Sequence, residues 1–317
     1  MELKQNPEDF IVHEIIDLDR KPGDYLYVEV TKKDLNTQDV INEICRVLNL
    51  QKRSVGFAGN KDKKAITTQY FSLYKVKKDS LSKIKIKDVK ITPLHYGSRP
   101  IFLGALTGNH FKIRYNKPIS RRIRLDSMVN YYGEQRFSSN NKDIGKAMLE
   151  RNFKKACTLI DNAKVNDYLK RKDDPIGALK IIDRSLLSLY INAFQAYLWN
   201  EVAKRFIREN YKHKIEHEGL YFVERPRTRV SIPLISFDAK IKNKTLARYY
   251  LELLRREGIR FFHYNLPEFQ NLISKTSFRP LFIKVSNFRV YKDFIEFDLP
   301  KGSFATIFLK NLEAISK

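Results

Sequence analysis

The sequence predicts an α+β fold, in which strands from both ends of the chain form a mixed or antiparallel sheet and a mainly helical stretch lies between them. Three observations support this class. Residues 9–33 and 66–76 have strand-like patterning, residues 141–210 carry apolar side chains at helical spacing, and strand patterning returns from residue 281. With 317 residues, of which 43% are hydrophobic, the chain can bury a large core in one or two domains.

The first elements are two strands followed by a helix. The segment EDFIVHEIIDLD has a β-branched run, and DYLYVEVTKK alternates aromatic and polar side chains, with a turn at Pro22 and Gly23 between them. Thr37 is a plausible N-cap for the helix that follows. Apolar residues then recur at helical spacing, namely Val40, Ile41, Ile44, Val47 and Leu48.

Two more strands are expected at SVGFAG and ITTQYFSLYKV, so that GNKDKKA, which contains Asp62, falls in the connection between them. In SKIKIKDVKI, Lys83, Lys85 and Lys87 alternate with apolar residues, which predicts a strand with lysines on one face. That face is either ordinary solvated surface or a surface that touches RNA phosphate.

The centre of the chain is predicted to be helical. The segment RSLLSLYINAFQAYLWNEVAKRFIREN carries a wide apolar stripe, which is most simply a core-facing surface. A second helix, LARYYLELLRREG, is expected to end at Gly258. The last part of the chain, from Leu281 to Leu312, is predicted to return to strand structure.

The chain is strongly basic, with 60 Lys and Arg against 36 Asp and Glu and a formal net charge of +24. Such a charge predicts attraction to polyanions. Nucleic acid is favoured over a membrane, because no apolar run reaches bilayer length and the first residues lack the apolar core of a signal peptide. We therefore expect a soluble cytoplasmic protein. The alternative is that the lysines only reflect a lysine-rich proteome.

Familiar enzyme signatures are missing from the sequence. Cys45 and Cys157 lie in no CxxC pair, and His213 and His217 stand four apart without a suitable carboxylate spacing, so we expect no metal. GNKDK differs from the guanine-reading NKxD because Lys63 occupies the place of the acid, and no GxxxxGKS/T phosphate loop is present. GxGxxG and GxSxG are also absent.

What remains is the single carboxylate of Asp62 among Lys61, Lys63 and Lys64. Neighbouring positive charge favours the ionised carboxylate, which can act as a nucleophile or a base. From the residues alone, an Asp that is neutralised by neighbouring lysines or that caps a turn is the more common case, so a catalytic role needs support from further motifs.

The segment FAGNKDKKAITTQYFSL resembles the signature of the TruD family of pseudouridine synthases, in which GxKDxxAxTxQ carries the catalytic aspartate. Four further motifs occur in the family's order, namely KQNPEDFIVHEI, IFLGALTGNHFKI, NYYGEQRF and LPKGSFATIFL. The resemblance spans nearly the whole chain. It implies a pseudouridine-synthase-like sheet with flanking helices and an inserted TRUD-type α/β domain.

The resemblance also implies the reaction. The family cuts the bond from C1′ to N1 of a uridine in tRNA, turns the base and joins C1′ to C5, without a cofactor or metal. Its best-known target is position 13 in the D arm. Asp62 aligns with the catalytic aspartate, and the sequence leaves open whether it attacks C1′ or removes a proton from C2′.

Further site residues are carried over from the same motifs. A flipped uracil needs stacking and hydrogen-bonding partners. The resemblance supplies a basic group near the acid and likely pocket residues, namely Lys4, Phe10, Asn130, Tyr132 and Phe304. The family commonly has phenylalanine where this chain has Tyr132, a position that either stacks on the base or packs beneath it, and tyrosine keeps the ring.

The resemblance divides the chain into a catalytic domain at residues 1–150 and 276–317 and an insertion domain at 151–275. The expected partner is tRNA, bound in a basic cleft, with no membrane, no required protein partner and a monomeric state. The main rival is a non-catalytic RNA-binding or chaperone protein on the same fold. An RNA methyltransferase would need a glycine-rich nucleotide loop, which the sequence lacks.

Overall fold

The computed structural model describes residues 6–117, 119, 123–138, 140–224, 226, 229–270 and 272–316. Contacts within the chain define two compact units. The first contains Met1–Asp126 and Lys284–Ala305, and the second contains Ser127–Ile283 and Thr306–Ile315. Both ends of the chain thus contribute to the first unit, and the α+β class predicted from the sequence is confirmed. No helix in the described ranges has both the length and the apolar character needed to cross a membrane.

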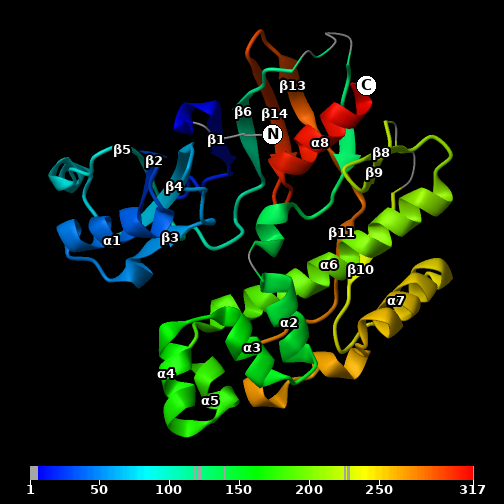
Figure 1. The fold of residues 1–317 in the computed structure, drawn as a ribbon. Coiled ribbons are helices and arrows are strands. Elements are labelled where there is room, and N and C mark those ends of the chain that lie inside the picture. The colour runs from blue at the N-terminus through cyan, green and yellow to red at the C-terminus, as the bar shows by residue number, and fades with distance from the viewer. Residues whose placement is uncertain are drawn as a thin grey trace. The chain divides into compact units, whose positions relative to one another are not determined.

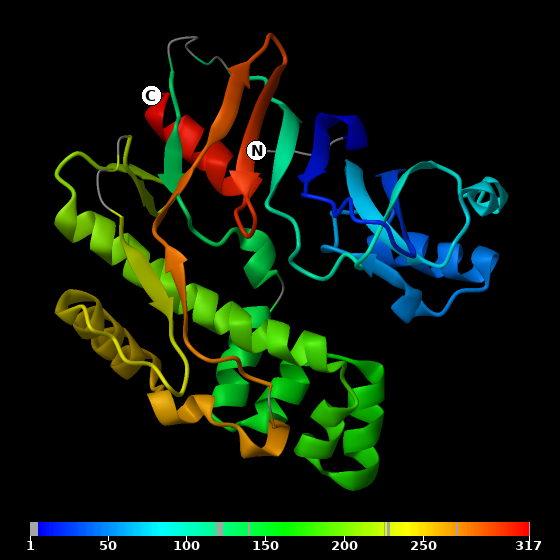
Figure 2. The ribbon, with the colours of Figure 1, turned by 180° about the vertical axis from the view of Figure 1, so that it is seen from behind.

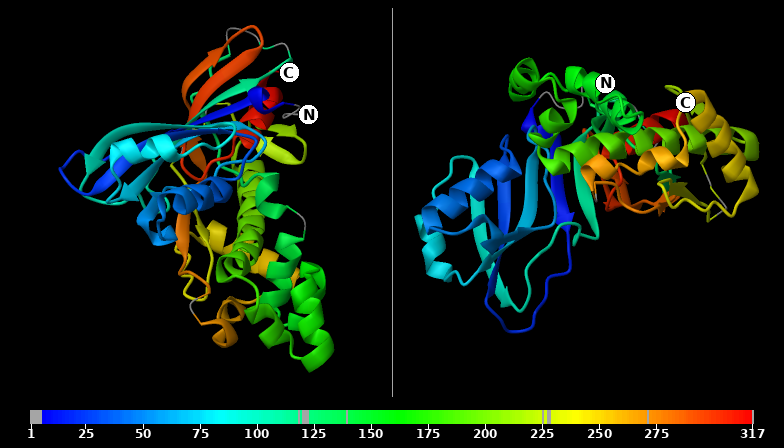
Figure 3. Two further views of the ribbon diagram at one scale, coloured as in Figure 1. Left: turned by 90° about the vertical axis from the view of Figure 1, so that its left-hand side faces the viewer. Right: turned by 90° about the horizontal axis from the view of Figure 1, so that it is seen from below.

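The first unit is built on a mixed sheet in the order β13-β14-β6-β1-β4-β2-β5, with β3 paired to β4. Within this order β1 and β4 run parallel, and the neighbouring pairs are antiparallel. The sheet is twisted, so that strands at its two edges cross at a large angle (Figure 3). Its strands are β1 (Phe10–Ile15), β2 (Tyr25–Lys33), β3 (Val55–Phe57), β4 (Ile66–Tyr74), β5 (Val89–Gly97), β6 (Gly108–Arg114), β13 (Ser286–Val290) and β14 (Phe294–Pro300).

Helix α1 (Thr37–Leu48) covers one face of the β2, β3 and β4 strands (Figure 1). Its buried side chains pack against alternate residues of β2 and β4. The N-cap is Asn36, so the expectation that Thr37 caps this helix is wrong. Thr37 instead turns its hydroxyl to the buried side chain of Gln69 on β4, at 2.9 Å.

The strand predicted at SKIKIKDVKI is also wrong in its first half, because β5 begins only at Val89. Ile84 and Ile86 still pack against the core under α1, and the intervening lysines are exposed. The backbone of Asp88 has a φ of +60°, which turns the chain just before the ladder begins. Residues 84–87 therefore keep the alternation of a strand outside the β5 ladder, and Asp88 joins β2 only through its carbonyl, which accepts from the Lys33 amide.

The second unit is organised around the long helix α6 (Arg184–Asn210), which lies beside α7 and the β10–β11 pair (Figure 2). Gly145 of α2 lies so close to α6 that an added Cβ would stand 2.0 Å from the Tyr190 carbonyl oxygen. The other helices are α2 (Asn141–Leu149), α3 (Phe153–Ile160), α4 (Ala163–Lys172), α5 (Pro175–Lys180), α7 (Lys244–Glu257) and α8 (Ala305–Ile315). The predicted end of α7 at Gly258 is confirmed, with a φ of +70°.

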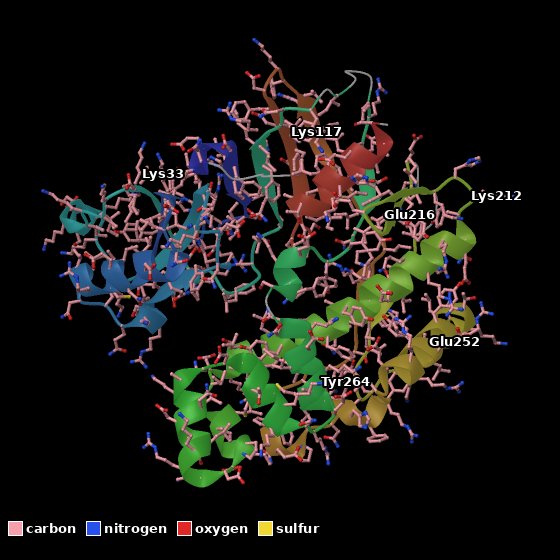
Figure 4. The ribbon with its side chains drawn as sticks, viewed as in Figure 1. Lys33, Lys117, Lys212, Glu216, Glu252 and Tyr264 are labelled. Atoms are coloured by element: carbon pink, nitrogen blue, oxygen red, sulfur yellow. The ribbon has the colours of Figure 1, made fainter. Side chains whose placement is uncertain are left out.

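Short strand pairs complete the second unit, with β7 paired to β12, β8 to β9 and β10 to β11. They are β7 (Ser127–Val129), β8 (Ile215–His217), β9 (Leu220–Phe222), β10 (Ser231–Leu234), β11 (Ser277–Pro280) and β12 (Phe282–Lys284). Short 3-10 helices occur in both units, at Pro7–Asp9, Lys52–Ser54, Lys78–Lys83, Glu134–Phe137, Phe261–Tyr264 and Pro267–Phe269. Tyr264, labelled in Figure 4, is buried in one of these turns.

The prediction of strand structure up to Leu312 is wrong for the last part of the chain, where α8 forms. Ala305, Phe308, Leu309 and Leu312 are all buried and stand at positions i, i+3, i+4 and i+7. This is the spacing of one helix face, which the strand patterning just before it had obscured.

Candidate active site

Asp62 lies in the connection between β3 and β4, as the sequence predicted, and its side chain is half-buried. The connection follows β3 at Phe57 and enters β4 at Ile66. β4 pairs with β1 on one side and with β2 on the other, so the loop leads into an interior strand of the sheet. Asp62 therefore precedes a strand that is hydrogen-bonded along both edges.

The backbone of this loop is held by a relay of buried polar side chains. The Lys61 amide donates to the Thr37 hydroxyl at 3.0 Å, and that hydroxyl donates to Gln69 Oε1 at 2.9 Å. Gln69 Nε2 in turn donates to the Gly59 carbonyl at 3.2 Å. Gln69, seven residues after Asp62 in the GxKDxxAxTxQ segment, thus fixes the loop on the side that precedes the acid.

Lys32 holds the loop at Asp62 itself. This lysine is 1% exposed, and its Nζ donates to the backbone carbonyls of Asp62, at 2.8 Å, and Leu35, at 2.7 Å. Burial lowers the pKa of the Lys32 amine to about 8, although the nearby Asp62 charge acts in the opposite direction. Lys32 shares its face of β2 with Leu26, Val28 and Val30, so a lysine at an apolar position was the signal that could have revealed it.

Lys61, next to Asp62, does not point to solvent. Its ammonium forms an ion pair with the carboxylate of Glu14 on β1, and the two side chains are 8% and 0% exposed. The other carboxylate oxygen of Glu14 accepts the Tyr70 amide at 3.3 Å. The positive charge that directly precedes Asp62 is therefore neutralised inside the unit. Neither Glu14 nor Lys61 was selected as a site residue from the sequence.

Phe10 and Phe304 belong to the same unit as Asp62, but their settings differ. Phe10 begins β1 and is 3% exposed, with its ring edge-on to Phe111 at 6.1 Å. Phe304 lies between β14 and α8 and is half-buried. Pro300, at the end of β14, is in register with Gly108 of β6, and Gly108 is in register with Ile15 of β1. The end of β14 therefore lies level with the last residue of β1, whereas Phe10 is the first residue of β1. Lys4 lies outside the described residues.

Asn130 is in the second unit and is 3% exposed. Its amide is fully engaged, because Nδ2 donates to the Pro280 carbonyl at 3.2 Å and Oδ1 accepts from Arg279 Nη2 at 2.6 Å. Arg279 also donates from Nε to the Asn130 carbonyl at 2.9 Å. Burial lowers the pKa of the Arg279 guanidinium. Arg279, just before the predicted C-terminal strands, was missed by the sequence reasoning.

Tyr132 belongs to the same cluster and is 8% exposed. Its ring lies 4.0 Å from the Arg279 guanidinium and meets the Trp199 ring edge-on at 5.8 Å. Asn200 fixes its backbone by two hydrogen bonds of 2.9 Å, one to the amide and one to the carbonyl. The sequence left two roles open for Tyr132, stacking on the base or packing beneath the site. The burial of its ring is typical of a packing residue.

A possible metal-ligating group occurs in the second unit, where His217, Glu218 and Glu313 bring one ligand atom each within 4.8 Å of one another. The Glu218 carboxylate already forms an ion pair with Lys310 at 2.9 Å, and His217 Nε2 lies 3.4 Å from Glu313. An ammonium thus supplies the positive charge beside these acids. His213 is not part of the group, because α6 ends at Asn210 and the two histidines share no helix.

A groove of about 410 Å³ lies between α6 and α7, and it contains none of the residues selected from the sequence. Its cations are paired with acids. Arg205 bonds to Glu209 at 2.8 Å and to Glu252, labelled on α7 in Figure 4, at 2.5 Å. These ion pairs join the two helices.

Comparison with known proteins agrees with the geometry. A family model described as tRNA pseudouridine synthase D (TruD) matches residues 1–164, 160–228 and 220–312. A relative from Archaeoglobus fulgidus, named a probable tRNA pseudouridine synthase D, is 27% identical over 98% of this chain and 93% of its own length. The tRNA pseudouridine synthase D of Aquifex aeolicus is 26% identical over 98% of this chain and 97% of its own.

A solved structure shares the fold. It is a Methanosarcina mazei protein described as a candidate TruD, with a TM-score of 0.69 at 23% identity over 98% of this chain and 92% of that one. The protein class is therefore that of the isomerases that modify tRNA. Within this class, the chain belongs to the tRNA pseudouridine synthase D (TruD) family.

Proposed function

We propose that this protein converts uridine to pseudouridine at position 13 of the D arm of tRNA, with Asp62 as its catalytic carboxylate. The observation that supports Asp62 most directly is the way its loop is held. Backbone groups on both sides of the acid are hydrogen-bonded to buried side chains, through Lys61 to Thr37 and through the Asp62 carbonyl to Lys32. Such bracing is what a reacting side chain requires.

The reaction needs little else from the protein. The glycosidic bond from C1′ to N1 breaks, the uracil turns, a bond from C1′ to C5 forms, the proton on C5 is lost to solvent and N1 takes up a proton, so the product is an isomer of the uridine. Two routes use the same ionised carboxylate, namely attack on C1′ or removal of a proton from C2′. In both, the base returns to the sugar it left, so no group is transferred to or from the enzyme overall.

The uridine must leave the stacked helix before it can react. In the first unit, we assign base stacking to the half-buried Phe304, and we assign Phe10 to support beneath, because its ring is packed on Phe111. In the second unit, we assign Asn130 and Tyr132 a supporting role, because both hold the side chain of Arg279. Lys4 keeps the role of a basic group near the acid.

The proposal keeps residues 1–150 and 276–317 as the catalytic domain and residues 151–275 as the inserted domain. The net charge of +24 supports tRNA as the partner, since a chain this basic is attracted to the phosphate backbone. A monomer acting on tRNA in the cytoplasm completes the proposal.

The proposal is tested by incubating unmodified tRNA transcripts with the protein and mapping pseudouridine by reverse transcription after carbodiimide treatment. We expect one new stop, at position 13, in transcripts that carry a uridine there. A matched transcript with cytidine at position 13 should give no stop. A stop at another position would contradict the assigned target, and no stop across a full tRNA pool would contradict the proposed activity.

A further inference from the structure

Two exposed lysines of the Asp62 loop and three of the segment that precedes β5 take no part in the hydrogen bonds that brace the loop. Lys63 and Lys64 follow the acid directly, and both are exposed. Lys83, Lys85 and Lys87 are exposed on the segment that precedes β5. Because Ile84 and Ile86 turn inward onto the core under α1, the three lysines of this segment face away from it. We call these five residues the lysine band.

Backbone contacts bring Lys64 and Lys87, one from each part of the lysine band, to the same end of the sheet. The Asp34 amide donates to the Ala65 carbonyl at 3.2 Å, and the Lys33 amide donates to the Asp88 carbonyl at 3.0 Å. The residues next to Ala65 and Asp88 are Lys64 and Lys87. The two segments therefore flank the end of β2, at the position of Lys33 in Figure 4.

The lysines of the band differ from the neighbouring Lys33 and Lys61, which form ion pairs with acids. Lys61 is paired with Glu14, and Lys33 is paired with Glu8 at 2.5 Å. Among the described residues, no acidic group lies within ion-pair distance of any lysine of the band. Asp34 and Asp88 are exposed at the same end of the sheet, so two acids stand against the five lysines of the band. The balance of charge there is positive, and exposed ammonium groups attract polyanions.

We propose that the lysine band binds the phosphate backbone of the tRNA that carries the target uridine, next to the loop of Asp62. The proposal rests on the proposed function and adds to it the surface that holds the RNA strand. Lys83 ends the 3-10 helix Lys78–Lys83 and Lys87 precedes the turn at Asp88, so the three lysines follow one another along one short exposed segment. The segment offers no apolar side chain to insert into a lipid surface, since its isoleucines are turned inward.

The test replaces the three lysines that lie outside the catalytic loop, in the variant Lys83→Gln/Lys85→Gln/Lys87→Gln. Lys52→Gln/Lys75→Gln/Lys77→Gln is the matched control, with the same loss of charge from the same unit. Its lysines are exposed and lie at the other end of the sheet, where Tyr74 ends β4 and Val55 pairs with Leu73. Both variants and the wild type are assayed on the same tRNA transcript over a range of salt concentrations.

We expect the band variant to raise KM for tRNA about 10- to 100-fold at 0.1 M salt and to lower the slope of log Kd against log salt by about 2 to 3. Its kcat should equal that of the wild type, and the control should change neither quantity. An equal rise of KM in the two variants, or no rise in either, would contradict the proposal that the lysine band binds tRNA. The proposed function would still stand in that case, because the wild type makes pseudouridine.

Two other outcomes have distinct meanings. If the wild type makes no pseudouridine but the band variant alone loses tRNA affinity, the binding surface stands and the proposed function fails. If the band variant binds tRNA as the wild type does but loses binding to vesicles containing anionic phosphatidylserine, the lysines serve a lipid surface and the proposal is wrong. Thermal melts of all three proteins should coincide, because the replaced side chains are exposed.

Discussion

The buried ammonium of Lys32 donates a hydrogen bond of 2.8 Å to the backbone carbonyl of Asp62 and another, of 2.7 Å, to that of Leu35. A charged group at this place costs desolvation energy, which its bonds to two carbonyl dipoles offset only in part. The same lysine joins β2 to the loop that presents the acid. It is therefore a positioning residue in the proposed mechanism, acting through the loop and not on the substrate.

Replacing Lys32 by methionine keeps the length of the side chain and removes both hydrogen bonds. We expect Lys32→Met to lower kcat about 10- to 100-fold, since a charge-assisted bond contributes about 1.5–3 kcal/mol, with KM for tRNA within about threefold of the wild type. Single-turnover and steady-state assays measure both. The neighbouring Lys33→Met, which removes an exposed ammonium from the same strand, is the control, and an equal loss of kcat there would contradict the role of Lys32.

The rate should depend on pH through the same amine. Burial lowers the pKa of Lys32 to about 8, so its ammonium is lost as pH rises through that value, and the rate of the wild type should fall there. Stability should not fall with it. Because the unfolded chain keeps this proton to higher pH than the folded one, the Lys32 contribution to stability rises between about pH 8 and 10.

A comparison of rate profiles isolates this effect. The rate of Lys32→Met, although low, should show no fall near pH 8. Since the tRNA is the same in both assays, its own titration affects both profiles equally. If the two profiles keep the same shape through pH 8, the loss of rate has another origin.

The buried pair of Lys61 and Glu14 gives a stability prediction. Glu14→Gln leaves a buried ammonium without its anion and should lower the free energy of unfolding by about 3–5 kcal/mol, measured by urea denaturation. Adding Lys61→Met to Glu14→Gln should restore most of that loss, because the isolated charge is then gone. If the double variant is less stable than the single one, the two side chains do not act as a pair.

Tyr132 is expected to act through its ring. Tyr132→Phe keeps the ring face that meets Arg279 and the edge that meets Trp199 but removes a side-chain hydrogen bond with Arg279, so kcat should stay near that of the wild type while stability falls by about 0.5–1.5 kcal/mol. Tyr132→Leu should cost about 1–3 kcal/mol of stability through lost packing and the lost cation–π contact. Thermal melts with activity assays test both, and an equally stable Tyr132→Leu would contradict the importance of this contact.

Much of the fold follows from local patterning. Alternation predicted β1, β2 and β4, and helical spacing predicted α1, α6 and α7, because apolar side chains recur along each of these segments at the period of its element. Residues 84–88 were predicted as a strand because apolar and charged residues alternate there, although no strand ladder forms. The segment from Ala305 was also predicted as a strand, because the strand pattern just before it hid the helical spacing of α8. Tertiary context decides such segments, and a short window cannot supply it.

The candidate site was only partly accessible to sequence reasoning. Asp62 was found through its segment and its basic neighbours, and the structure places it in the predicted loop. The residues that hold this loop are Glu14, Lys32 and Gln69, and each acts across strands that are distant in the chain. Arg279 and Asn130 meet across 149 positions. Such partners become visible only once the strands are paired.

The most direct test of the central claim compares Asp62→Asn with the wild type on one unmodified tRNA, measuring binding and single-turnover formation of pseudouridine in parallel. Asp34→Asn is the control, because Asp34 is exposed close to the same loop and its φ of +52° suits asparagine. We predict that Asp62→Asn binds the tRNA as tightly as the wild type and forms no pseudouridine, while Asp34→Asn remains active. Formation of pseudouridine by Asp62→Asn at the wild-type rate would show that another group performs the chemistry.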